Sequence, residues 1–179
     1  MERTEVLLAC EFLNSHGVIA VPTDTLYGIA ARVDDSKALE RIYKIKGRDS
    51  SKPIAVCVSG IDQIERVANI DNFDTNLFKS LLPGPLTIVL RRSNSLNPDL
   101  NPNASNIGVR IPDHSFVRAI SDELGCPLAL TSANKSGETS PLRIEDFQDI
   151  WNDLDAVFDL GSLKPGVPAP DSQLSMHLR

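Results

Sequence analysis

The sequence predicts a single-domain α/β fold in which short buried strands alternate with amphipathic helices. Apolar runs such as "GVIAVPT", "PIAVCVS" and "CPLALTS" have the length and composition of buried strands, and stretches with helical apolar spacing separate them. This alternation favours a twisted sheet, mixed or largely parallel, with helices flanking it. A chain of 179 residues also suffices for one domain with a substantial core.

Hydrophobic spacing, caps and turn residues place the elements in order. The N-terminal half is expected to hold a helix at 6–13, a strand at 17–23, a helix at 38–46, a strand at 53–59 and a short helix at 61–67. Asp34, Asp35 and Ser36 offer N-caps for the 38–46 helix, and Gly47 is a natural residue to follow its end.

The C-terminal half continues the alternation. It is expected to hold a helix at 72–82, strands at 86–92 and 107–112, a helix at 114–124, a strand at 126–132, a helix at 144–151 and a strand candidate at 155–161. The polar loop at 93–106 is either a functional excursion or a mobile one. The domain is therefore expected to span 1–161, with a proline-containing tail at 162–179 that is extended or disordered.

Composition excludes several classes of protein. The net charge of -6 argues against broad non-specific nucleic-acid binding, and no apolar window is long enough for a transmembrane helix. The 3 cysteines and 3 histidines are scattered, which predicts free thiols in a reducing compartment and no metal site. The acidic N-terminus lacks the features of a secretory or mitochondrial leader, so we expect a cytoplasmic protein, although a longer product could carry mitochondrial targeting.

Polar residues follow several of the predicted strands. Thr23-Asp24-Thr25, Arg110 and 131–134 each come at the end of an apolar run, where α/β proteins place their ligands. These residues include no Ser-His-Asp or Cys-His nucleophilic set, so the pattern suits binding and orienting a polar small molecule. The alternative is purely structural, with these side chains capping helices and making turns, and with Arg110 paired to Asp113.

A cluster of cations precedes the 53–59 strand. It consists of Arg41, Lys44, Lys46, Arg48 and Lys52. Lys44 and Lys46 suit a helix C-terminus, where cations complement the helix dipole. Arg48 and Lys52, with two serines between them, have the composition of a polyphosphate clamp, but a solvated charged face explains them equally well. No Walker glycine loop is present, so any nucleotide would be held mostly by side chains.

Several stretches together carry a family resemblance. "GVIAVPTDTLYGIAA", "IYKIKGRDSSKPIAV", "LLPGPLTIVL", "IGVRIPDH" and "PLALTSANKSG" occur in this order and resemble the YrdC/TsaC family of threonylcarbamoyl-AMP synthases over roughly 17–161. The resemblance implies an open, twisted mixed sheet with a concave basic face. It also implies synthesis of L-threonylcarbamoyl-adenylate from L-threonine, bicarbonate and ATP with Mg²⁺. A downstream threonylcarbamoyl-transferase complex would then modify adenosine 37 of tRNA.

The resemblance also assigns site residues. Positions similar to the family's L-threonine contacts are Thr25, Cys57, Arg110 and Leu130. Positions similar to its ATP contacts are Arg48, Lys52, Asn106, Ser132 and Ser140. Lys46 and Arg48 form the K-x-R motif and are the expected catalytic residues, while Asn134 completes the S-A-N motif. No side-chain nucleophile is required, because the carbamate formed from threonine and bicarbonate attacks the α-phosphate.

The chain departs from the family pattern after Gly161. A later S-T-V-V-D-like strand and an arginine-containing turn cannot be identified, so the chain is expected to be a variant or C-terminally truncated member with a weakened ATP site and an open sheet edge. The alternative is that its C-terminal sequence is incorrectly predicted. The alternative function is a catalytically weak or inactive module that binds RNA or ATP. A carbamoyl-transfer domain of a hydrogenase-maturation protein is a further alternative, which the absence of acylphosphatase-like and zinc-finger segments disfavours.

Overall fold

A computed structural model describes residues 3–47, 53–71, 73, 75–163 and 175–177. Within these residues the helices are α1 (Arg3–Asn14), α2 (Ser36–Lys46), α3 (Thr75–Leu81) and α4 (Ser115–Leu124), with 3₁₀ helices η1 (Ile61–Arg66) and η2 (Ile144–Asp153). The strands are β1 (Ile19–Pro22), β2 (Tyr27–Arg32), β3 (Ala55–Cys57), β4 (Thr87–Arg91), β5 (Asn106–Arg110), β6 (Leu128–Ser132), β7 (Ala156–Val157) and β8 (Ser175–His177).

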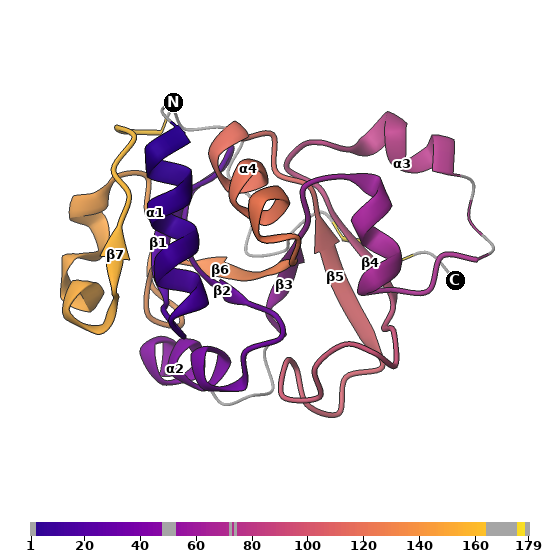
Figure 1. Ribbon diagram of the computed structural model, residues 1–179, viewed down its shortest axis with the longest axis horizontal. Helices are drawn as coiled ribbons and strands as arrows, with labels where there is room; N and C mark the ends of the chain where they lie inside the picture. The colour runs from indigo at the N-terminus through magenta and orange to yellow at the C-terminus, as the bar shows by residue number, and fades with distance from the viewer. Residues whose placement is uncertain (1–2, 48–52, 72, 74, 164–174, 178–179) are drawn as a thin grey trace.

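These strands form one open mixed sheet, which confirms the predicted fold class. Their spatial order is β7-β1-β2-β6-β3-β5-β4-β8 in the described part of the chain (Figure 1). The β1–β2, β2–β6, β3–β6 and β4–β5 pairs are antiparallel, whereas β1–β7, β3–β5 and β4–β8 are parallel. Parallel pairs require crossover connections, and the connection from β3 to β5 contains η1 and α3.

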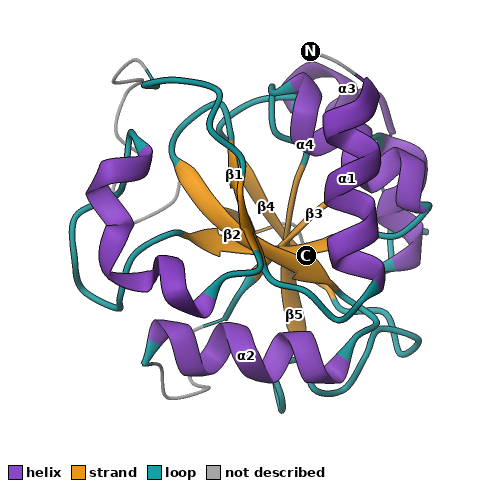
Figure 2. Cartoon of the chain, turned by 60° about the vertical axis from the view of Figure 1, so that its left-hand side comes forward, coloured by secondary structure: helices purple, strands orange, loops and turns teal. Residues whose placement is uncertain are grey.

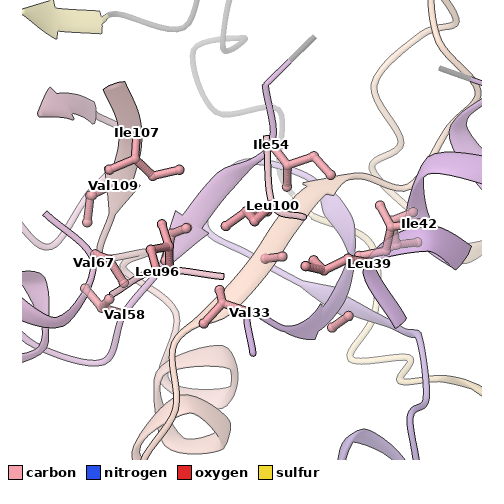
Figure 3. Close-up of a cluster of buried hydrophobic side chains, with 14 of the residues drawn as sticks. Val33, Leu39, Ile42, Ile54, Val58, Val67, Leu96, Leu100, Ile107 and Val109 are labelled. Carbon is pink, nitrogen blue, oxygen red and sulfur yellow. The ribbon is translucent and has the colours of Figure 1, made fainter. Parts of the chain in front are cut away.

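One face of the sheet packs against α2, η2 and α3 and holds the larger core. Leu39 and Ile42 of α2 point toward the strands, and Ile107 and Val109 of β5 lie in the same cluster (Figure 3). Leu96 and Leu100 of the polar loop join them, so this loop contributes to the core. The loop at 93–106 is therefore packed onto the domain through Leu96 and Leu100. Its last residues, 103–106, remain available to line the opposite face of the sheet.

The other face is covered only in part. Helices α1 and α4 pack together over β1, β2 and β6, with α1 and α2 on different sides of the strands (Figure 2). Their contacts reach Leu130 and Cys57 but not the alternate residues of β5 and β4. Because side chains alternate between faces along a strand, Gly108 and Val89 point to this same uncovered area.

The helix caps follow the sequence closely. Asp35 caps α2, with its carboxylate accepting hydrogen bonds from the backbone N–H groups of Lys37 and Ala38. Gly47 follows the helix with a φ of 55°, a left-handed conformation that glycine adopts without steric cost. These two residues fix where α2 ends and therefore where Lys46 lies.

Some elements differ from the sequence prediction. The sequence pattern does not predict the hairpin strand β2, because "YGIAAR" lacks the alternation of apolar and polar residues that marks a strand, and half of its residues are glycine or alanine. The predicted helices at 61–67 and 144–151 are 3₁₀ in form. In the expected tail, residues 175–177 form β8, which pairs with β4 at the sheet edge.

Candidate functional site

A cavity of about 500 Å³ opens on the uncovered part of the sheet. Ala55 of β3 and Gly108 of β5 contribute to its floor, and Asn106 lies at its rim. The end of the polar loop, residues 103–105, provides another wall. A cavity of this size falls within the range that takes a drug-sized or cofactor-sized ligand.

The small residues Gly108 and Ala55 at the floor of the cavity leave it deep. A Cβ atom added to Gly108 would lie 3.0 Å from Cγ2 of Thr87 and 3.9 Å from Cβ of Ala55. The contact with Thr87 is tighter than side chains normally tolerate, so a larger residue at position 108 would displace this wall. Thr87 is 2% exposed, and its hydroxyl has no hydrogen-bond partner. A buried hydroxyl without a partner is uncommon, which makes Thr87 a candidate ligand contact.

Arg110, the last residue of β5, directs its guanidinium into the turn between β1 and β2. Its Nη2 donates to Asp24 Oδ1 at 2.5 Å and to Thr25 Oγ1 at 2.9 Å, and its Nε donates to the carbonyl of Gly84 at 3.4 Å. The side chains of Arg110 and Asp24 are only 9% and 12% exposed, so solvent screens their ion pair weakly. The partner of Arg110 is thus Asp24 and not Asp113.

The turn that carries Asp24 is held by a threonine. Thr23 Oγ1 accepts hydrogen bonds from the backbone N–H groups of Thr25 and Leu26 and donates to the Leu26 carbonyl at 2.8 Å. These bonds fix the backbone on both sides of Asp24 while leaving its side chain to Arg110. This use of a hydroxyl to close a turn is a common role of threonine after a strand.

Cys57 and His114 lie near this ion pair, and Leu130 shares an apolar cluster with Cys57. Cys57 is next to Arg110 in the β3–β5 pairing, and burial raises the pKa of its thiol to about 12. Leu130, on β6, is 6% exposed and packs beneath α1 and α4. His114 is half-buried at the N-terminus of α4, its Nδ1 has no partner, and burial lowers its pKa. Because of its raised pKa, the Cys57 thiol is neutral at physiological pH.

A second polar cluster forms where α2 meets the end of β6. The ammonium of Lys46, a residue 1% exposed, donates to the Ser132 carbonyl at 2.7 Å, to Ser132 Oγ at 3.1 Å and to Asn134 Oδ1 at 2.8 Å. Asn134 in turn donates to the carbonyls of Glu138 and Thr139 at 2.6 and 3.1 Å. In this structure the Lys46 ammonium thus points at protein acceptors and orders the loop that leads to Ser140.

The predicted site residues fall into two clusters, two exposed residues and two residues that lie outside the described ranges. Thr25, Cys57 and Arg110 come together at the carboxyl ends of β1, β3 and β5, and Leu130 of β6 pairs with Ala55 on the neighbouring strand β3. Lys46, Ser132 and Asn134 form the second cluster, and Asn106 and Ser140 are exposed. Arg48 and Lys52 lie outside the described residues.

Sequence reasoning did not single out Thr87 or His114. Thr87 follows the "PGP" turn in the sequence. In the antiparallel β4–β5 pair Ile88 lies opposite Val109, so the preceding residue Thr87 lies opposite Arg110. Strand pairing therefore reveals Thr87, and its sequence neighbours give no signal for it. His114 is four positions after Arg110, and only its unpartnered ring nitrogen draws attention to it.

The described residues provide neither a metal site nor a membrane-spanning helix. Across the described ranges, no group of three or more His, Cys, Asp or Glu side chains is arranged to hold a metal ion. None of the helices in those ranges is long and apolar enough to cross a membrane.

Comparison with known proteins identifies relatives along nearly the whole chain. The Sua5_yciO_yrdC family, described as "Telomere recombination", matches residues 11–173. The threonylcarbamoyl-AMP synthase of Bos taurus is 44% identical over 90% of this chain and 58% of its own length. A putative threonylcarbamoyl-AMP synthase of Methanocaldococcus jannaschii is 38% identical over 94% of this chain and 80% of its own length.

The fold is shared with a solved structure as well. P. abyssi Sua5 complexed with L-threonine superimposes with a TM-score of 0.90 and 26% identity, covering 99% of this chain and 52% of that one. This chain therefore spans little more than half the length of the mammalian relatives and of that archaeal protein.

Proposed function

This chain belongs to the Sua5/YciO/YrdC family, and we propose that it synthesises L-threonylcarbamoyl-adenylate. The reaction joins L-threonine, bicarbonate and ATP and releases pyrophosphate and water. The observation that carries the proposal is the arginine at the end of β5, which lies beside a cavity on the open part of the sheet. A buried guanidinium recognises a carboxylate through paired charge-assisted hydrogen bonds.

Threonine would bind at the ends of β1, β3 and β5. Arg110 would hold its carboxylate, Thr25 would contribute the hydroxyl that already lies 2.9 Å from Nη2, and Cys57 and Leu130 would line the pocket. The Cys57 thiol is neutral because burial raises its pKa to about 12, so it would offer a small neutral wall and no nucleophile.

ATP would occupy the adjoining cavity. The bound ATP would extend from Asn106 at the rim of the cavity toward the polar cluster that contains Ser132. Ser140 would contact it from the loop that Asn134 orders. Arg48 and Lys52 belong to the same proposal as phosphate contacts. We propose that Lys46 acts with Arg48 in the K-x-R motif mainly by positioning, since its ammonium already holds the oxygens of Ser132 and Asn134.

The metal belongs to the nucleotide in this proposal. Mg²⁺ commonly binds through substrate phosphates and only one or two carboxylates, so a dedicated protein cage is not required. The described residues supply no such cage. We therefore propose that Mg²⁺ enters with ATP as part of the substrate.

The chemistry would depend on placement and charge. Threonine's amine and bicarbonate give a carbamate, whose oxygen attacks the α-phosphorus of ATP while pyrophosphate leaves. The protein would hold the two substrates in adjoining sites and offset the negative charge that develops, which are the main contributions available without a nucleophilic side chain.

The product would be passed to a separate transferase complex for modification of adenosine 37 in tRNA. That partner and any contact with tRNA are part of the proposal. We also propose a cytosolic location, because Cys10, Cys57 and Cys126 are all unpaired and buried, as in proteins of reducing compartments.

The test is pyrophosphate release by the purified chain with Mg²⁺-ATP, bicarbonate and L-threonine, omitting each in turn. Release should require all of them. Arg110→Ala should lower the efficiency with threonine on the order of 10- to 100-fold, the usual range for a charged hydrogen bond. Arg3→Ala, which changes an exposed arginine of α1, is the matched control and should have no effect.

Two results would overturn the proposal. One is release that does not depend on threonine, which would make the protein a different nucleotide-cleaving enzyme. The other is no release from a folded chain, which would favour a module that binds ATP or RNA without turnover. RNA held through phosphates would dissociate steeply as salt is raised, and threonine would not compete with it.

A further inference from the structure

We propose that Asp24 restricts the threonine site to zwitterionic α-amino acids by exchanging its ionic partner. In the empty site the Asp24 carboxylate pairs with Arg110, and in the filled site it pairs with the ammonium group of the substrate. This inference rests on the proposed function, because it assumes that Arg110 receives the substrate carboxylate.

The Asp24 carboxylate already occupies the place that a substrate carboxylate needs. Its Oδ1 lies 2.5 Å from Nη2 of Arg110, the same nitrogen that donates to Thr25 at 2.9 Å. Both charged side chains are close to nine-tenths buried. An incoming carboxylate must therefore share Arg110 with Asp24 or displace it.

Displacement has a different cost for different ligands. Arg110 and Asp24 form a neutral pair, and a monocarboxylate added to that pair leaves one excess negative charge in a shielded place. An α-amino acid brings an ammonium group on the carbon next to its carboxylate, so the released Asp24 gains a new partner. Breaking a buried ion pair without replacing it is strongly unfavourable, and the zwitterion avoids this cost.

Of the described side chains beside Asp24 other than Arg110, neither the Cys57 thiol nor the His114 ring offers the displaced carboxylate a fixed cation. The thiol of Cys57 is kept neutral by burial, which raises its pKa. His114, influenced by the charges of Asp24, Arg118 and Asp113, is biased toward its neutral form because burial lowers its pKa. Arg118, a half-buried residue of α4, has its Nη2 3.9 Å from Oδ1 of the exposed Asp113.

The exchange requires only a side-chain rotation. Thr23 Oγ1 is hydrogen-bonded to the backbone on the far side of Asp24, at Thr25 and Leu26, and so holds the turn in place. The Asp24 side chain itself has Arg110 as its partner. A fixed turn with one rotating carboxylate suits a residue that selects substrates.

The experiment compares two ligands by calorimetry: L-threonine and 3-hydroxybutyrate, which is threonine without its amino group. The native chain should bind threonine at least 10-fold more tightly. In Asp24→Asn, threonine should bind about 10- to 100-fold more weakly and 3-hydroxybutyrate more tightly, so that the preference is lost. Asp24→Glu keeps the charge and should retain the preference, while Asp62→Asn changes an exposed carboxylate and should match the native chain.

The outcomes separate this inference from the proposed function. Threonine binding with an unchanged ligand preference in a folded Asp24→Asn variant would overturn the role of Asp24 and leave the threonine site intact. Equal weakening of both ligands would also overturn it, because that result indicates a purely structural role. No threonine binding by the native chain, with or without Mg²⁺-ATP, would overturn the proposed function and this inference together.

Discussion

The ammonium of Lys46 lies 2.8 Å from the side-chain oxygen of Asn134, although the two residues are 88 positions apart in the chain. Lys46 is 1% exposed and Asn134 6% exposed, so this contact is made away from solvent. A buried ammonium requires acceptors around it, since an unsatisfied charge in the interior is costly. The contact therefore ties the end of α2 to the segment after β6 and holds the two polar motifs of the candidate ATP site together.

Replacing Asn134 with alanine should destabilise the domain. The substitution removes one acceptor from the buried ammonium and two donated bonds, to the carbonyls of Glu138 and Thr139. Lost hydrogen bonds of this kind cost about 1–3 kcal/mol of unfolding free energy. Urea unfolding followed by circular dichroism measures the change.

Asn152→Ala is the control for this prediction, because Asn152 is exposed on η2. It should change the unfolding free energy by less than about 0.5 kcal/mol. A similar small change in Asn134→Ala would show that the Lys46 ammonium finds other acceptors and that the cluster contributes little to stability.

The cysteines should react slowly with thiol reagents in the folded chain. Burial raises the pKa of Cys57 to about 12 and of Cys10 and Cys126 to about 11, with Glu123 and Asp34 respectively adding to the effect on the latter two. At pH 8 the thiolate fraction of each is then on the order of one part in a thousand or less. Titration with Ellman's reagent should show slow native reaction and 3 rapidly reacting thiols in urea.

A thiol that reacts within seconds in the native protein would contradict this prediction. Mass spectrometry after alkylation would identify it. Rapid reaction at Cys57 in particular would mean that the candidate threonine pocket opens readily, because this residue is 1% exposed in the structure.

Local sequence was sufficient for much of the fold and for part of the site. The apolar runs at β3 and β6 and the caps of α2 depend on neighbouring residues, and the structure confirms them. Strand β2 was missed because "YGIAAR" has no polar alternation: it is buried almost throughout, between β1 and β6. Its place depends on pairing partners distant in sequence, which local patterns do not encode.

The same limit applies to the site. Arg110 could be selected from the sequence because a cation after a buried strand suggests an anionic ligand. Its partner Asp24 is 86 positions away, and their contact depends on the β1–β2 turn reaching the end of β5. From the sequence, the nearby Asp113 is the expected ion-pair partner of Arg110. In the structure Oδ1 of Asp113 instead lies 3.9 Å from Nη2 of Arg118. Thr87 likewise joins the cavity only through the β4–β5 register.

His114 should make stability depend on pH. Burial lowers its pKa, opposed by Asp24 and Asp113 and assisted by Arg118. Below pH 6.5 the unfolded chain therefore binds a proton that the folded chain resists, so the stabilising effect is complete above the unfolded pKa and is lost as pH falls through the folded one. Urea unfolding at several pH values between 7.5 and about 5 measures this decline.

His114→Asn removes the titrating ring and should flatten the decline over the same pH range. Other groups, the carboxylates above all, contribute their own pH dependence in both proteins. The informative quantity is thus the difference between the two curves. Parallel curves would show that the ring titrates equally in the folded and unfolded chains, and its lack of an Nδ1 partner would then have no energetic consequence.

Tyr27 should hold the segment after β7 against the sheet. Its hydroxyl accepts a hydrogen bond from the Leu160 N–H at 3.2 Å and donates to the Gly161 carbonyl at 2.8 Å, with Asp159 Oδ1 at 3.3 Å as a second acceptor. Tyr27→Phe keeps the buried ring, which packs at a tilt against Phe147, and removes only these polar contacts. The Leu160 amide should then exchange with solvent about 10-fold or more faster, since its protection depends on that one hydroxyl.

Hydrogen exchange read by NMR provides an internal control two residues away. The Phe158 amide donates to the Ala20 carbonyl of β1 at 3.0 Å and does not involve Tyr27. Its exchange rate should stay unchanged if the effect is local. Equal acceleration of both amides would instead indicate that Tyr27→Phe lowers the stability of the whole domain. In that case the hydroxyl would stabilise the sheet generally and would not act as a local anchor for the segment that leads to Gly161.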